Sequence, residues 1–67
     1  MGSSDRLRRN LIKIRKEKGL TQEKLAYESG MSKGYLSEIE AGKKSPTVRI
    51  LEKLAETLEV SPSRLLK

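Results

Sequence analysis

The stretch TQEKLAYESGMSKGYLSEIE, residues 21–40, restricts the possible folds more than any other part of this chain. It holds two short helical patterns with one glycine, Gly30, between them. Two helices joined by so tight a turn can cross at roughly 90–120°. The crossing needs a small residue where the helices approach, which Ala26 supplies, and a turn residue that tolerates positive φ, which Gly30 supplies. Leu36 and Ile39 then anchor the second helix. The spacing therefore predicts a helix-turn-helix.

Helical spacing of apolar residues continues on both sides of this stretch. Strand-like alternation is absent and β-branched residues are sparse, so no strand is predicted. The predicted helices cover about residues 5–18, 21–29, 32–41, 45–58 and 61–66. Ser45-Pro46 and Ser61-Pro62 are strong start signals for the last two, because proline at the first helical position has no N–H to leave unpaired. The short connections predict a compact all-α domain of five helices.

The predicted core is aliphatic, because Tyr27 and Tyr35 are the only aromatic residues. Tyr27 is expected to be partly buried on the second helix. The inner face of the fourth helix is predicted to carry Val48, Leu51, Leu54, Ala55 and Leu58.

Length and composition exclude several classes of protein. A chain of 67 residues suits one domain, predicted over residues 5–67, with residues 1–4 as a tail or a vector-derived remnant. The absence of Cys and His excludes disulfides, thiolate or imidazole metal sites, and Cys or His catalysis. No apolar run approaches membrane-spanning length. We therefore expect a cytoplasmic protein that is not an enzyme and that has no cofactor, metal, membrane or small-molecule partner.

Positive charge is concentrated near the N-terminus. The net charge is +6, and residues 1–18 hold seven basic and two acidic residues, a local balance of +5. Such a balance suggests nucleic acid or an anionic membrane as a partner. A membrane-bound first helix is disfavoured, because its apolar residues are needed for the core and the chain has no Trp or Phe. The outer basic residues reach flanking phosphates or face solvent; they are Arg6, Arg8, Arg9 and Lys13.

Two stretches, GLTQEKLAYESGMSKGYLSEIEAG and SPTVRILEKLAETLEVSPSRLL, resemble the lambda-repressor-like helix-turn-helix family of the Cro-repressor or xenobiotic-response-element type. The match covers about Leu7 to Leu66. The resemblance implies that the helix over 32–41 enters the major groove of double-stranded DNA, and that two chains bind a near-palindromic operator as a homodimer. It also implies a structural ion pair between Arg15 and Glu40.

The same resemblance implies a set of DNA contacts. Gln22 is implied to contact a phosphate, and Lys33 a phosphate or a guanine edge. Gly34 occupies a position that often carries a base-reading side chain and here carries none. The full set of implied DNA-binding residues is Thr21, Gln22, Ser32, Lys33, Gly34, Tyr35, Ser37, Glu38, Lys43 and Lys44.

The last two predicted helices hold more apolar residues than one small core obviously needs. We predict that Ile50, Val60, Leu65 and Leu66 form the interface of a symmetric dimer. The favoured function is a sequence-specific transcriptional regulator, either a repressor or a controller protein. The alternative is a protein-interaction module or antitoxin-type partner that keeps the fold, a reading supported by Gly34 and Glu38.

Overall fold

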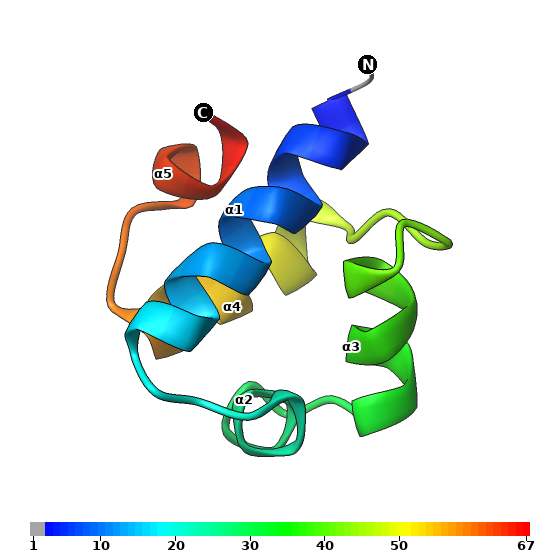
Figure 1. The fold of residues 1–67 in the computed structure, drawn as a ribbon, viewed down its shortest axis with the longest axis vertical. Helices are drawn as coiled ribbons and strands as arrows, with labels where there is room; N and C mark the ends of the chain where they lie inside the picture. Colours follow the sequence, from blue (N-terminus) through cyan, green and yellow to red (C-terminus); the bar gives the residue numbers. More distant parts are fainter. Residues whose placement is uncertain (1–2) are drawn as a thin grey trace.

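The computed structural model describes residues 3–67 as five helices connected by short loops (Figure 1). They are α1 (Ser3–Glu17), α2 (Gln22–Glu28), α3 (Lys33–Glu40), α4 (Val48–Leu58) and α5 (Pro62–Leu66). No strand occurs among these residues, so the predicted all-α fold of five helices is confirmed. α1 begins at Ser3, so it includes two of the four residues predicted as a tail; the other two lie outside the described residues.

Hydroxyl groups define where three helices begin. The side chains of Thr21, Ser32 and Thr47 each accept a hydrogen bond from the backbone N–H three residues further on, at 3.0, 3.1 and 3.2 Å. Each bond satisfies one of the N–H groups that a helix leaves unpaired at its start. α5 begins at the predicted Ser61-Pro62.

The predicted start of the fourth helix is wrong. Ser45 and Pro46 belong to the connection between α3 and α4, and Thr47 caps the helix. Both Ser45 and Thr47 are good capping residues, so local sequence cannot rank them. The later start leaves Val48 in the first turn of α4 with 73% of its surface exposed. Val48 has the spacing of the inner face but lies at the helix end, beyond the core, so its predicted burial is also wrong.

The helices enclose a single aliphatic core. α1 packs against α3 and α5, α2 packs against α3 and α4, and α4 packs against α5. The buried apolar residues are Leu7, Leu11, Ile14, Leu25, Ala26, Leu36, Ile39, Leu54, Ala55, Leu58 and Leu65. None of the described helices combines the length and the apolar character needed to cross a membrane.

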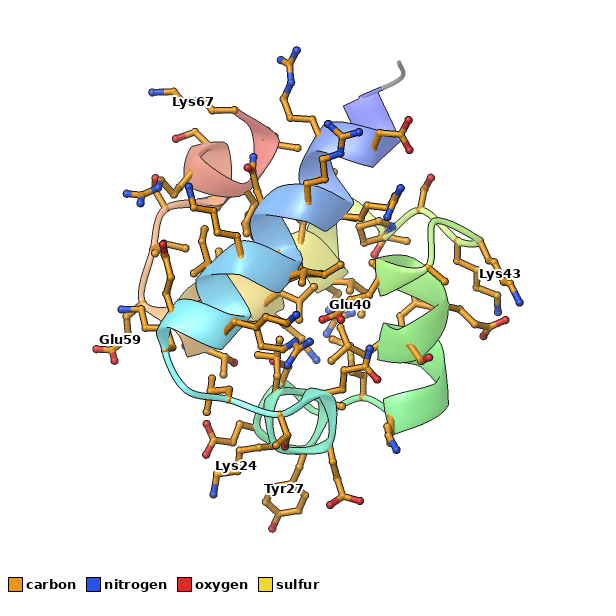
Figure 2. The ribbon with its side chains drawn as sticks, in the orientation of Figure 1. Lys24, Tyr27, Glu40, Lys43, Glu59 and Lys67 are labelled. Atoms are coloured by element: carbon orange, nitrogen blue, oxygen red, sulfur yellow. The ribbon has the colours of Figure 1, made fainter. Side chains whose placement is uncertain are left out.

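Two predictions, the surface position of Leu65 and the partial burial of Tyr27, are wrong. Leu65, predicted at a dimer interface, is completely buried. α5 packs against both α1 and α4, and Asn10 Nδ2 donates to the Leu65 carbonyl at 3.0 Å, so Leu65 closes one end of the core. Tyr27, expected to be partly buried, is 82% exposed, because it points away from the face of α2 that holds Leu25 and Ala26 (Figure 2).

Candidate nucleic-acid interface

α2 and α3 form the helix-turn-helix that the sequence predicts. Gly30 follows α2 with φ of +75°, and the Met31 N–H donates to the Ala26 carbonyl at 2.9 Å. The positive φ suits glycine, which has no Cβ to clash. Ala26 is buried, as are Leu36 and Ile39 on α3. This apolar contact fixes one side of α3 against the domain and leaves its other side outward.

The outward side of α3 carries four of the predicted contact residues. Lys33 and Gly34 are exposed, and Ser37 and Glu38 are half-buried. Residues four apart lie one above the other on a helix, so Lys33 aligns with Ser37, and Gly34 with Glu38. A Cβ at Gly34 would meet no atom within 4 Å, so this part of the surface is open. α3 thus presents a polar strip with a gap at Gly34.

A buried ion pair holds the end of α3 against α1. Arg15 Nε donates to Glu40 Oε2 at 2.8 Å, and Arg15 Nη2 donates to Glu40 Oε1 at 3.1 Å. The third guanidinium nitrogen, Nη1, donates to the Leu20 carbonyl at 2.7 Å. The Arg15 and Glu40 side chains are only 11% and 4% exposed. The structure therefore contains the pair that the family resemblance implies.

Gln22 joins this pair from the start of α2. Its Nε2 donates to Glu40 Oε1 at 2.8 Å, so the carboxylate accepts three hydrogen bonds from two side chains. Sequence reasoning missed this contact, because 18 positions separate the two residues and no local pattern connects them. The family resemblance implies a phosphate contact for Gln22, whereas in the structure its side-chain amide donates a hydrogen bond to Glu40.

At the start of α3, residues of three segments line one open hollow. Its lining residues are Arg15, Thr21, Gln22, Glu23 and Lys33. Three predicted DNA contacts, Thr21, Gln22 and Lys33, are thus neighbours. The hydroxyls of Thr21 and Ser32 are already used as helix caps, although a hydroxyl oxygen has two lone pairs and keeps its own hydrogen to donate.

Beyond the other end of α3, Lys44 folds back onto the helix. Its Nζ lies 3.6 Å from Glu38 Oε1 and 5.6 Å from the centre of the Tyr35 ring. Tyr35 is half-buried and packs against the core, so its ring is a fixed surface for the ammonium. Lys43 is exposed and projects outward from the loop (Figure 2). The two lysines therefore differ: Lys44 has partners on α3, and Lys43 extends toward solvent.

The geometry described so far is that of a small domain presenting one helix outward between basic residues. A helix-turn-helix family model, HTH_3, matches residues 11–65 of the chain. The chain belongs to this helix-turn-helix family.

Relatives of this helix-turn-helix chain include regulators and a controller protein. It is 47% identical over 57 residues to the uncharacterised HTH-type transcriptional regulator y4dJ of Sinorhizobium fredii. The alignment covers 85% of this chain and 74% of y4dJ. It is 50% identical over 52 residues to the HTH-type transcriptional regulator SlrR of Bacillus subtilis, covering 76% of this chain but only 34% of SlrR. Among solved structures it resembles the restriction-modification controller protein C.AhdI of Aeromonas hydrophila, with a TM-score of 0.87 and 33% identity, covering 90% and 91% of the two chains.

Proposed function

We propose that the protein is a DNA-binding transcriptional regulator, not an enzyme, that reads a specific sequence with α3 in the major groove. The observation that carries the proposal is the outward strip of α3, which begins with Lys33 and is followed, beyond the end of the helix, by Lys43 and Lys44. An α-helix fits into the major groove of B-DNA, where each base pair shows a distinct pattern of hydrogen-bond donors and acceptors. The family relatives named as transcriptional regulators support the same function.

The contacts divide into two kinds. In this proposal Lys33, Ser37 and Glu38 would contact base edges, where lysine can donate to guanine and a carboxylate can accept from cytosine N4. The remaining predicted residues would contact phosphates and fix the register of α3. These are Thr21, Gln22, Ser32, Tyr35, Lys43 and Lys44. At Gly34 the DNA backbone or a base could approach the helix closely, because no side chain intervenes.

Two chains acting together would read an operator with two-fold symmetry. The surface that we assign to the dimer is smaller than the sequence predicts, because Leu65 is used inside the core. It consists of Leu66, which is 49% exposed, with the half-buried Ile50 and Val60 beside the core. A regulator of this kind would act in the cytoplasm of a bacterium, as a repressor or a controller protein.

Selection of binding sites from a random DNA pool, at near-physiological salt and with sequencing of the bound fraction, tests the proposal. We expect an enriched inverted repeat whose half-sites lie about one helical turn apart. Retention of DNA without enrichment would contradict sequence reading. Failure to retain any DNA would contradict DNA binding itself and would favour a protein-interaction module, for which Gly34 and Glu38 on the outward strip are the supporting residues.

A further inference from the structure

Arg8 lies against the loop that follows α3. A Cβ placed on Gly42 would lie 3.3 Å from both Cδ and Nε of Arg8. The arginine side chain therefore passes over a loop position that has no side chain. Lys43 is the next residue, so Arg8 lies over the loop one position before this exposed lysine.

The position of Arg8 follows from the geometry of α1. Arg8 and Arg15 are seven residues apart, which is close to two helical turns, so they lie on one stripe of α1 about 10 Å apart along its axis. Arg15 meets Glu40 at the end of α3, and Arg8 meets Gly42 in the loop beyond it. Figure 1 shows this loop passing beside the N-terminal half of α1.

Internal contacts leave much of the Arg8 guanidinium available. In the part of the chain that the structure describes, its one hydrogen bond runs from Nε to Asp5 Oδ1, at a long 3.4 Å. The Arg8 side chain keeps 34% of its surface exposed. A partly exposed ion pair of this length is weak, so Arg8 can exchange Asp5 for a stronger partner. A phosphate is such a partner, because the guanidinium fork can give it two parallel hydrogen bonds.

We propose that Arg8 contacts a DNA phosphate next to the one held by Lys43, so that the phosphate-binding surface extends from the loop onto α1. This inference rests on the proposed function. It separates Arg8 from Arg6, a neighbouring basic residue of α1. Arg6 is two positions away and therefore lies about 200° around the helix from Arg8. Arg6 is exposed and belongs to the side of α1 turned away from the Gly42 loop.

The test compares Arg8→Gln with Arg6→Gln, which removes the same charge from the same helix. The dissociation constant for the duplex most enriched in the selection is measured over a series of salt concentrations. Each lost phosphate contact lowers the slope of log affinity against log salt by about 0.9, so a dimer that loses two Arg8 contacts should lose about two units of slope. Arg6→Gln should keep the wild-type slope, and Arg8→Lys should restore most of what Arg8→Gln loses.

The outcomes separate this inference from the proposed function. Salt-dependent binding by the wild type, with the same slope in Arg8→Gln and Arg6→Gln, overturns the Arg8 contact alone. No binding by the wild type overturns the proposed function and the contact with it. Thermal unfolding of each variant shows whether it is folded in the assay.

A second variant should raise the affinity for DNA instead of lowering it, and it leaves Arg8 in place. Asp5→Asn removes the carboxylate that competes for the Arg8 guanidinium, so it should bind DNA more tightly than Glu17→Gln, a matched charge change at the other end of α1. Equal affinities for these two variants overturn the inference even if Arg8→Gln does not fold.

Discussion

Arg15 and Glu40, which are 25 positions apart in the sequence, form a bidentate ion pair with N–O distances of 2.8 and 3.1 Å. The pair links the end of α1 to the end of α3, and the Gln22 amide extends it to the start of α2. Side chains of three helices thus meet at the Glu40 carboxylate, and these hydrogen bonds fix the orientation of α3 relative to α1 and α2. Both charges are nearly removed from water, so each depends on the other to offset the cost of desolvation.

We therefore expect Glu40→Ala to lower the free energy of unfolding by about 3–5 kcal/mol, because it leaves the Arg15 guanidinium buried without its counter-charge. Urea unfolding followed by circular dichroism measures the loss. The matched control is Glu28→Ala, whose partner Lys24 is 3.4 Å away on the exposed surface of α2. That pair should contribute only about 0.3–0.5 kcal/mol. Equal losses in the two variants would show that burial gives the Arg15–Glu40 pair no special weight.

Local chemistry made most of the fold predictable. The helix-turn-helix follows from short-range rules: a small residue at the approach, glycine at the positive φ, and apolar residues one turn apart. The start of α5 at Ser61-Pro62 was predictable for the same reason, since proline at the first helical position is a local preference. The family resemblance added the Arg15–Glu40 pair, which no local spacing reveals.

The errors occur where tertiary packing decides between local alternatives. Ser45 and Thr47 both suit a cap, and only the structure selects Thr47. Leu65 and Leu66 are chemically identical neighbours, yet one is completely buried and the other 49% exposed. The contacts of Gln22 with Glu40 and of Lys44 with Tyr35, and the position of Arg8 over Gly42, join segments far apart in sequence or in different elements. Composition and periodicity carry no information about such contacts.

Substitution of Gly34 should stabilise the protein. It lies in the first turn of α3, and a Cβ there meets no atom within 4 Å. Alanine restricts the unfolded chain more than glycine does, so we expect Gly34→Ala to raise the free energy of unfolding by about 0.5–1 kcal/mol. DNA affinity should fall in the same variant if DNA approaches the helix closely at this position; unchanged affinity would remove that role for Gly34.

Gly30→Ala is the control variant, and it should lower the free energy of unfolding instead of raising it. Space at Gly30 is equally open, but its φ of +75° is unfavourable for any residue with a Cβ. We expect a loss of about 1–2 kcal/mol, entirely from the backbone conformation. Urea denaturation of both variants under the same conditions makes the comparison. Stabilisation of both, or destabilisation of both, would contradict the roles assigned to the two glycines.

Glu38→Gln should strengthen binding to DNA of random sequence. The change removes a negative charge from the outward strip of α3 and releases Lys44 from its 3.6 Å contact with Glu38. Exposed ion pairs are worth about 0.2–1 kcal/mol, so the gain should reach about fivefold at most. Fluorescence anisotropy with a labelled random duplex measures it. Glu56→Gln, an exposed residue of α4, controls for net charge alone and should change affinity less.

Leu65 and Leu66 offer a last prediction that separates folding from assembly. Leu65→Ala empties a completely buried site between α1 and α4, so it should cost about 2–5 kcal/mol of unfolding free energy. Leu66→Ala should cost much less, because half of that side chain is already in water, but it should weaken self-association. Thermal unfolding and sedimentation over rising concentration, with and without operator DNA, measure the two effects. A wild-type chain that stays monomeric throughout would remove the dimer, whereas dimers unaffected by Leu66→Ala would move the interface away from α5.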